Sequence, residues 1–435
     1  MSKIASGKVL LSRRTPDWLP AVLFVLALLM VAFGYGYLSA TRHYPPDGLI
    51  RLARDTVADW SKHWENDLGI EPNRNLVSAR PGRQRVVTYH PDQLAQGLRL
   101  IAGLTAGRKA LNGAVLLHAD GTEMHYWPVD YALLDPDGPD PENVLLHGIA
   151  VFSDGSIIVN FDEGRVLARL DACGNAIWIN RGWYHHAVSR SWDGTIWALN
   201  WDEDSDTLDQ LDVANGQLIQ RISLMKDVIL AHGRKGEFLA KFPEGEDQLV
   251  TPVDPFHTND VEVLSPDLAP AFPGFSVGDL LISLRSVNLV AVVDANTHDL
   301  KWSSTGPWYR QHDPDFQPDG TISVFDNNMG FGVSRIVTIN PVSGNYRTLY
   351  AGREDQPFYS WRRGQQKLLY NGNLLIVESE HGRVFEVDHN GEMVWEYNNI
   401  YDDTRNGVVT RGMLLPDDFF KQGALQCGSQ SPDKQ

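Results

Sequence analysis

Three histidines hold the same place in a repeated pattern of this chain of 435 residues. His147, His186 and His312 each lie seven residues before the aspartate of an Asp-Gly turn signal, and His257 begins a fourth, similar segment, HTNDVEVL. A neutral imidazole is nucleophilic, exchanges protons near neutral pH and binds metal ions. Equivalent positions of repeats arranged about an axis converge on that axis. The spacing therefore predicts one shared site built from these histidines.

Several uses of such a cluster are compatible with the residues alone. A histidine repeated by duplication can simply brace neighbouring repeats, although several unpaired imidazoles in one cavity are costly unless they bind something. A metal centre is disfavoured because the chain contains no H-x-H or H-E-x-x-H pair and no paired carboxylates at ligand spacing. A nucleophilic histidine and a plain ligand-binding cavity both stay open at this point.

The charge balance narrows the range of partners. The 38 lysines and arginines face 55 aspartates and glutamates, which gives a formal charge of −17. Such a surplus of acid disfavours a nucleic-acid partner. The chain also has no G-x-x-x-x-G-K-[ST] loop to hold a phosphorylated donor. The residues indicate no cofactor and do not define the oligomeric state.

The elements that must position the histidines are short strands. From about residue 111, runs rich in Val, Ile, Leu, Trp and Tyr alternate with Asp-Gly and Asn-Gly turn signals. Five clear copies of a unit of about 40 residues, the size of a propeller blade, begin at Asp154, Asp193, Gly278, Asp319 and Asn371. A degenerate copy fits between the second and the third. Because radial stacking buries faces that one unit leaves exposed, the pattern predicts an all-β, six-bladed β-propeller over residues 111–415, with seven blades as the alternative.

The N-terminal segment has the character of a membrane span. Residues 18–41 contain no charged side chain and can cross a hydrocarbon core of about 30 Å as a helix. Residues 1–17 hold four basic residues and one acidic residue, a bias that keeps this tail in the cytoplasm. A cleaved signal peptide is the alternative, but the apolar run is long and ends in a poor cleavage site. The sequence favours a single-pass inner-membrane anchor with the propeller on the periplasmic side.

Residues 42–110 are expected to form a helical stalk and a linker. Pro45 and Pro46 end the apolar helix. A second helix that begins at Asp47 would place apolar side chains along one face at helical spacing. We therefore expect a packing helix between the anchor and the propeller.

A C-terminal tail is expected over residues 416–435. It contains Cys427, one of only two cysteines, and the other is Cys173. No C-x-x-C pair is present, so a thiolate zinc site is not indicated. The two cysteines lie far apart in the sequence and could pair if the C-terminal tail folds back, but two unpaired thiols are favoured over a disulfide.

The segment around His312 carries a resemblance to a known family. Residues 311–328, QHDPDFQPDGTISVFDNN, resemble the glutamine-histidine segment of the bacterial arylsulfotransferases with its following FDN. Earlier in the chain, WYHHAVSRSWDG resembles that family's double-histidine segment, HTND its H-x-N segment, and LISLRSVNLVAVVD its strand with a serine-x-arginine. LLYNGNLLIVESEHGRVFEVDHNGEMVWEY resembles its closing blade. The resemblance covers about residues 145–400 and implies a propeller that transfers sulfuryl groups between phenols.

The resemblance implies a role for each matching residue. His312 would accept the sulfuryl group as a transient sulfohistidine. Arg285 would hold the sulfate oxygens, which suit the planar fork of donors of a guanidinium. His257 and Asn259 would donate to the same oxygens or to the bridging oxygen. His186 would be the acid for the leaving phenolate or the base for the incoming phenol.

His185 competes with His186 for that last role. Because side chains alternate along a strand, only one of the two is expected to face the channel. His186 is favoured because it keeps the seven-residue spacing. A phenol ring could stack on nearby aromatic side chains, for which blade packing is the other explanation. These are Trp308, Tyr309, Phe358, Tyr359 and Trp361.

A second function stays open, namely a non-catalytic, membrane-anchored propeller that acts as a ligand-binding or scaffold module. DANTHDLKW, DACGNAIW and DHNGEMVW also look like the blade-closing D-x-x-x-G-x-x-x-W motif of quinone-cofactor propellers. That motif docks blades together and by itself indicates no cofactor. A convergent set of His and Arg side chains would favour the sulfotransferase over both.

Overall fold

The computed structural model describes residues 18–42, 75–105, 107–108, 110–202, 205–234, 236–238 and 255–427. The chain divides into two compact units, residues 1–72 and 73–435. The N-terminal tail and the stalk helix expected from Asp47 lie outside the described residues.

The described part of the first unit is the helix α1 (Leu19–Arg42). Its apolar stretch from Leu19 to Ser39 is long enough to cross a membrane, and most of its described side chains are exposed. This confirms the apolar N-terminal helix, whose length and composition suit either a signal sequence or an anchor.

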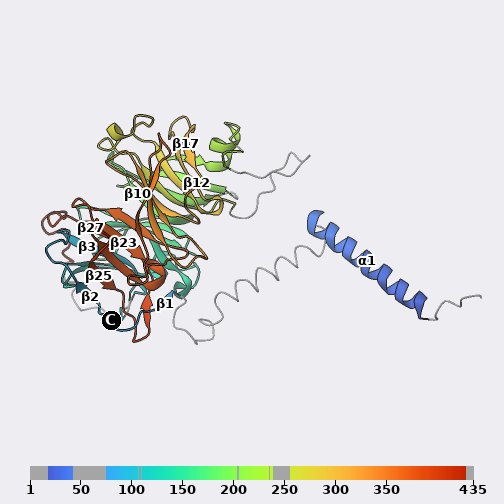
Figure 1. Ribbon diagram of the computed structural model, residues 1–435, viewed down its shortest axis with the longest axis horizontal. Coiled ribbons are helices and arrows are strands. Elements are labelled where there is room, and N and C mark those ends of the chain that lie inside the picture. The colour runs from blue at the N-terminus through green and yellow to red at the C-terminus, as the bar shows by residue number, and fades with distance from the viewer. Residues whose placement is uncertain are drawn as a thin grey trace, which may run out of the picture. The chain divides into compact units, whose positions relative to one another are not determined.

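The second unit forms six antiparallel blades, which confirms the predicted six-bladed β-propeller (Figure 1). The first blade comprises β6 (Leu145–Val151), β7 (Ile157–Asp162), β8 (Val166–Leu170) and β9 (Ala176–Arg181). The second comprises β10 (Trp183–Arg190), β11 (Thr195–Asp202), β12 (Ser205–Asp212) and β13 (Leu218–Ser223). The third comprises β14 (Thr258–Val263), β15 (Leu280–Leu284), β16 (Leu289–Val293) and β17 (Leu300–Ser304). A fourth comprises β18 (His312–Phe316), β19 (Ile322–Asp326), β20 (Arg335–Ile339) and β21 (Tyr346–Ala351).

The fifth and sixth blades also use strands from the start of the domain. The fifth joins β22 (Gln365–Leu368), β23 (Leu374–Glu378), β24 (Arg383–Val387) and β25 (Met393–Asn398) to β2 (Val86–Thr88). The sixth has the order β27 (Val409–Leu415), β3 (Leu98–Leu104), β4 (Asn112–Leu117) and β5 (Glu123–Val129). A separate pair joins β1 (Leu76–Ser78) to β26 (Arg405–Gly407).

The ring closes by pairing the two ends of the domain. Figure 1 shows β3, in blue, beside β27, in red, and Leu100 pairs with Met413 across them. The expected start of the propeller at residue 111 is therefore wrong, because residues 86–104, assigned to the stalk and linker, supply strands to two blades. Pairing of the first and last segments of the domain in one sheet holds the ring closed, and radial repetition leaves only short, protected strand edges.

The middle strands of the blades are the most buried. All residues of β15, β16, β23 and β24 are buried, whereas the outer strands β9 and β21 are largely exposed. β15, β16 and β23 accordingly read as nearly continuous apolar runs. Short helical turns connect the strands: α3 (Tyr131–Leu134), η1 (Pro141–Asn143), η2 (Leu224–Leu230), η3 (Ala269–Ala271), η4 (Arg285–Val287) and η5 (Ser379–His381).

The repeated Asp-Gly signals form the predicted turns. The side chains of Asp154, Asp193 and Asp319 each accept a hydrogen bond from the backbone N–H two residues later, at 3.0 to 3.1 Å. The following glycines have φ between +77° and +84°, a region that glycine reaches without strain. The turns fix the repeat from which the histidine spacing was read.

The innermost strands of five blades share an irregularity in their pairing with the next strand. The register shifts within β6, β10, β14, β18 and β27. Beside three of these shifts a non-glycine residue has a positive φ, namely His186 at +53°, His257 at +50° and Asp313 at +48°. Bulges of this kind re-aim side chains and are common beside active sites.

The two cysteines form a disulfide, Cys173–Cys427, across 254 residues of sequence. The expectation of unpaired thiols is therefore wrong. Phe419, Phe420 and Leu425 pack against the core shared by the β27–β3–β4–β5 blade and the β6–β9 blade and carry the C-terminal segment back to the β8–β9 turn. This return of the chain is a tertiary feature that sequence spacing does not reveal.

Candidate functional site

Imidazoles from three inner strands meet at one end of the channel. The ring centroids of His147 and His186 lie 4.5 Å apart, and those of His186 and His257 lie 5.1 Å apart. His147 belongs to β6, His186 to β10, and His257 precedes β14. The structure therefore brings together two of the three repeated histidines, His147 and His186, with His257, whereas His312 is related to them here by the charges of His257 and His147 that act on it.

His312, the first residue of β18, is 4% exposed and has a defined tautomer. Its Nδ1 lies 2.6 Å from Oδ1 of Asn327. The Asn327 amide nitrogen donates to the carbonyls of Ser360 and Arg363, so the amide oxygen must face the imidazole as an acceptor. The proton therefore sits on Nδ1 and leaves a lone pair on Nε2. That Nε2 atom is buried and has no hydrogen-bond partner among the described residues.

Burial, and then the charges of Arg285 and His257, hold the pKa of His312 well below its usual value, although the bond to Asn327 opposes this. The imidazole is therefore neutral at neutral pH, the form that can act as a nucleophile. Arg285 begins η4, and its backbone N–H donates to the His257 carbonyl at 3.2 Å. This backbone contact joins the predicted arginine to the predicted H-x-N segment.

Asn259 and Gln311 support the position of His312 from the side. The Asn259 amide nitrogen donates to the carbonyl of Gln311 at 2.8 Å. Gln311 is fully buried, and its side chain donates to the Ser283 hydroxyl and the Leu289 carbonyl. Both residues thus hold the start of β18 against the neighbouring blade, and Asn259 has one amide N–H already committed to the backbone.

His185 and His186 are not separated by regular strand alternation. Their Nδ1 atoms lie 2.8 Å apart, because the register shift between His185 and Val188 and the left-handed backbone of His186 turn the two rings toward each other. The expectation that the two side chains point opposite ways is therefore wrong. His186 is the one whose ring also lies against His147 and His257.

Asp162 and Arg363 are members of this cluster that the sequence did not single out. Asp162 Oδ1 lies 2.6 Å from Nδ1 of His147, and its Oδ2 lies 3.2 Å from Arg363. Burial alone would raise the pKa of Asp162, but His147 and Arg363 outweigh it and hold this pKa well below its usual value. The two residues are 201 positions apart, so no local pattern indicates that they meet.

His147, Asp162 and His186 also bring potential metal-ligating atoms within 4.8 Å of one another. The cations around them argue against a metal ion. Arg363 already pairs with the carboxylate, and the charges of Arg363 and Arg411 act on His147. A group with this surplus of positive and hydrogen-bonding side chains suits an anion, and we assign no metal there.

A second polar layer follows along the same inner strands. A cavity of about 340 Å³ is lined by residues of all six innermost strands, among them the carboxylates Asp260, Glu262, Asp313 and Asp315 and the cations Lys367 and Arg411. Burial, followed by the neighbouring Asp315, raises the pKa of Glu262 to about 8 and that of Asp313 to about 7. At neutral pH this layer therefore holds buried carboxyl groups that retain protons beside the cations Lys367 and Arg411, which distinguishes it from the histidine end.

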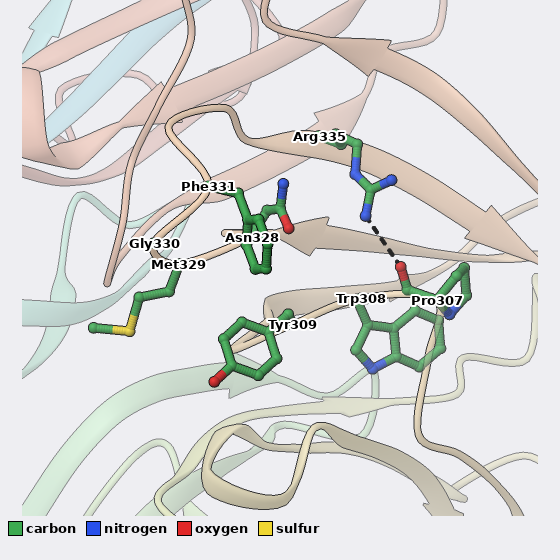
Figure 2. A pocket seen from close by; sticks show the side chains of 8 residues that line it. All are labelled: Pro307, Trp308, Tyr309, Asn328, Met329, Gly330, Phe331 and Arg335. Atoms are coloured by element: carbon green, nitrogen blue, oxygen red, sulfur yellow. Dashed lines mark hydrogen bonds between the residues drawn. The ribbon is translucent and has the colours of Figure 1, made fainter.

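An open pocket of about 600 Å³ adjoins the segments that carry His312 and Asn327. Figure 2 shows the Tyr309 ring, the Phe331 ring and the Met329 side chain around it. The rings of Tyr309 and Phe331 are nearly perpendicular, with centroids 6.2 Å apart. The N–H of Asn328 donates to the Tyr309 carbonyl at 3.0 Å. The pocket therefore rests on the loop before β18 and the loop after β19.

The aromatic residues named from the sequence differ in their placement. Trp308 and Phe358 are 4% and 1% exposed and belong to the core. The Tyr359 hydroxyl accepts from the N–H of Gly330 and supports the pocket loop. Only Tyr309 combines 41% exposure with a place in the pocket. Phe331, 70% exposed, was missed, although it lies shortly after the FDN segment in FDNNMGFG.

Comparison with protein families gives one match. A family model described as arylsulfotransferase (ASST) matches residues 148–400, more than half of the chain. This range contains every candidate residue of the histidine cluster except His147. No curated protein sequence matches the chain.

Solved structures are similar to the chain at low identity. A protein of unknown function from Bacteroides caccae is 13% identical with a TM-score of 0.48, and the match covers 73% of this chain and 98% of that one. A functionally unknown protein from Desulfotomaculum acetoxidans is 12% identical with a TM-score of 0.43, covering 72% and 98%. TolB from Acinetobacter baumannii is 13% identical with a TM-score of 0.44, covering 73% and 66%. At these values the structural matches contribute nothing to a functional assignment.

Proposed function

The chain belongs to the arylsulfotransferase (ASST) family, and from this premise we propose that it transfers a sulfuryl group from a phenolic sulfate ester to a phenol through a sulfohistidine at His312. Family membership implies aryl sulfotransferase activity on aryl sulfate and phenol substrates. The observation that carries the proposed route is the His312 imidazole. It is neutral and protonated on Nδ1 by its bond to Asn327, and it has a bare Nε2.

The reaction runs in two half-reactions at this Nε2 atom. In the first, the Nε2 lone pair forms a bond to sulfur while the ester S–O bond breaks, and the leaving phenolate takes a proton from the site. In the second, a phenol loses its proton to the site, its oxygen bonds to sulfur, and the N–S bond breaks. Division into two steps through a covalent intermediate makes a difficult transfer easier and gives ping-pong kinetics.

The negative charge of the transferred group needs donors that are already in place. Arg285 acts electrostatically on His312, and His257 adjoins the same arginine through the backbone. A planar guanidinium can bind two sulfuryl oxygens at once, and fixed donors stabilise charge that develops during transfer. We propose Arg285 and His257 as these donors, with Asn259 contributing its second amide hydrogen.

We assign the aryl ring of the substrate to the pocket of Figure 2. Tyr309 lies three residues before His312, a span of at most about 11 Å, and Asn328 follows Asn327 directly. An aromatic ring between Tyr309, Phe331 and Met329 would make edge-to-face and sulfur–aromatic contacts. Such contacts bind the ring of either a donor or an acceptor phenol.

The apolar helix and the disulfide indicate an extracytoplasmic protein, because disulfides persist in oxidising compartments. We propose that α1 is an uncleaved inner-membrane anchor that holds the propeller on the periplasmic side. A donor that is itself an aryl sulfate fits that location, since it needs no cytoplasmic nucleotide.

The decisive experiment uses the full chain in detergent with a chromogenic aryl sulfate, with and without a phenol acceptor. Wild type should release the chromogenic phenol in an acceptor-dependent way, and brief mixing with donor alone should leave an alkali-stable SO₃ adduct on the His312 peptide. His312→Ala should lower kcat by about 10⁴-fold or more, the scale on which loss of an enzyme nucleophile acts. His118→Ala, at an exposed histidine outside the site, is the control.

Turnover that survives in His312→Ala would reject His312 as the nucleophile. A folded wild type without turnover on any donor would instead favour a non-catalytic, ligand-binding propeller.

The pocket assignment has a separate test. Phe331→Ala should raise KM for aryl donors about 10-fold, with kcat changed less than about 3-fold, because an aromatic contact and its buried area contribute about 1–2 kcal/mol. Val342→Ala, at an equally exposed apolar residue on another loop, should leave KM unchanged. An unchanged KM in Phe331→Ala would remove the ring from this pocket.

A further inference from the structure

Two adjacent histidines and a buried carboxylate form a row that ends at His147 and His257 of the histidine cluster. The Nδ1 atoms of His185 and His186 are 2.8 Å apart. On the other side of its ring, His185 Nε2 is 3.7 Å from Oδ1 of Asp206, which is 3% exposed. Asp206 Oδ2 accepts hydrogen bonds from the Thr258 hydroxyl at 2.6 Å and the Thr258 N–H at 3.3 Å. The carboxylate is thereby held with its Oδ1 toward the imidazole.

The row depends on a local departure from strand geometry. In a regular strand, consecutive side chains point to opposite faces. Here the bulge between His185 and Val188 and the positive φ of His186 place two consecutive imidazoles in hydrogen-bond contact. A left-handed backbone at a non-glycine residue is strained and persists only where the surroundings enforce it. Strained backbone conformations of this kind cluster at active sites and ligand-binding sites.

The contacts restrict where protons can lie. Exactly one proton lies between the two Nδ1 atoms, because a hydrogen bond needs one donor and one acceptor. His185 Nε2 lies 3.7 Å from Oδ1 of Asp206, an ion-pair distance rather than a hydrogen bond, and the negative charge of the carboxylate favours a hydrogen on that nitrogen. If His186 holds the shared proton, its Nε2 is bare and can act as a base. If His185 holds it, His185 is a cation beside Asp206, and neutral His186 carries its own hydrogen on Nε2, where it can act as an acid.

We propose that Asp206 and His185 are positioning residues that move a proton to and from His186, so that His186 serves both half-reactions without itself becoming a cation. This inference rests on the sulfuryl transfer proposed for His312 and adds the device that supplies its protons.

The proton balance closes over one catalytic cycle. In the first half-reaction, the leaving phenolate takes the Nε2 hydrogen of His186, and the shared proton passes from His185 Nδ1 to His186 Nδ1. In the second, the bare Nε2 takes the proton of the incoming phenol, and the shared proton returns to His185. The pair begins and ends the cycle with one positive charge, located on His185 next to Asp206.

The surroundings of His186 make this arrangement advantageous. Its ring faces His147 from β6 and His257 ahead of β14, and the charge of Asp162 from β7 acts on it from a third side. Burial, and then the neighbouring His147, hold the pKa of His186 well below its usual value. A proton is therefore better held on His185, where the carboxylate offsets the charge.

A series of aryl sulfates with leaving phenols of increasing pKa tests the relay in the full-length protein. His185→Asn keeps an oxygen near the position of Nδ1 but cannot carry the proton, and Asp206→Asn keeps an acceptor for Thr258 without the charge. Both variants should lose about 10²-fold in kcat for a poor leaving group such as phenol itself, since general acid catalysis contributes about 10²–10⁴-fold. For 4-nitrophenol, which leaves without help, the loss should be less than about 3-fold.

The control is Asp209→Asn, at another buried carboxylate of β12, which binds Arg221 and Tyr184. Its rates should change equally across the series, as expected of a structural effect. A loss in His185→Asn or Asp206→Asn that is likewise uniform over all leaving groups, or no loss, would overturn the relay.

A second measurement does not require turnover and separates the relay from the function that it serves. In protein labelled with ¹⁵N-histidine, acid titration should charge one histidine while a second changes its protonated nitrogen in the same step, and His185→Asn should abolish both signals. Asp206→Asn should move this step to lower pH, because it removes the charge that stabilises the proton. Two histidines that titrate independently would overturn the relay even in an active enzyme, whereas the coupled step in an inactive protein would reject only the sulfuryl transfer.

Discussion

At the scale of single residues, the surroundings of His312 control which nitrogen can react. Asn327 is fully buried, and its two amide hydrogens are committed to backbone carbonyls. Its oxygen is therefore fixed as the acceptor for Nδ1. The Asn327 oxygen would also stabilise the positive charge that the imidazole gains once sulfur has bonded to Nε2, because an N–H···O hydrogen bond strengthens when its donor becomes cationic.

Asn327→Ala should reduce kcat about 10- to 100-fold, equivalent to the cost of about 1–3 kcal/mol for leaving the Nδ1 donor without a buried acceptor. KM should change little, since Asn327 does not face the aromatic pocket. Stopped-flow turnover with a chromogenic donor measures this, with urea unfolding recorded in parallel. The control is Asn328→Ala, at the residue next to Asn327. It removes a hydrogen bond from the Asn328 side chain to the Val333 carbonyl and should lower stability without a matching loss of kcat.

At the scale of elements, the bulged inner strands make the site. Gly148 in β6 illustrates the close approach that this requires. Its N–H donates to the Asn160 side chain at 2.7 Å, and a Cβ at this position would meet the His186 carbonyl and would lie 2.6 Å from the Asn160 oxygen. Only glycine lets β6 and β10 approach so closely at the level of the histidines.

Gly148→Ala should therefore destabilise the fold by about 1–3 kcal/mol, the usual cost of overpacking, and should displace His186 enough to reduce turnover more than the lost stability explains. Gly274→Ala adds the same methyl group in open space and should be close to neutral. Urea unfolding midpoints measure the stability of both variants against wild type, and kcat measures their turnover. Equal stability of the two variants would show that β10 can shift without cost.

At the scale of the whole molecule, the channel brings together charges from all six blades. The histidine end is rich in donors for an anion, and the second layer carries a surplus of buried carboxylates. Glu262 makes that layer sensitive to pH, because burial and Asp315 raise its pKa to about 8 in the folded protein. The unfolded chain releases the same proton near pH 4.5. Between these values the folded state binds more protons than the unfolded state, so stability falls as pH rises.

Glu262→Gln should remove this contribution. The variant should match wild type near pH 4.5 and become progressively more stable than wild type up to about pH 8, after which the difference should stay constant. Thermal unfolding from pH 4.5 to 9 measures the effect. Glu354→Gln, at an exposed glutamate, should follow wild type throughout, and a difference that is independent of pH in Glu262→Gln would contradict the buried proton.

The amino-acid sequence alone determined the repeat, the six blades, the apolar helix and the family segments. These features are encoded locally, in strand periodicity and in turns such as Asp154-Gly155, or in short motifs such as the one that contains Gln311 and His312. The sequence also predicted that His147, His186 and His312 converge, since equivalent positions of a closed ring meet at its axis, and the structure brings His147 and His186 together with His257.

Only the tertiary structure decided the rest. The strands contributed by residues 86–104, the Cys173–Cys427 disulfide and the Asp162–Arg363 ion pair join segments that are hundreds of residues apart, which no local pattern records. The contact between His185 and His186 was predicted wrongly because the prediction assumed regular alternation, whereas a bulge reverses the direction of one side chain. Local periodicity therefore specifies which residues approach the axis, but backbone irregularities and long-range pairing decide which atoms touch there.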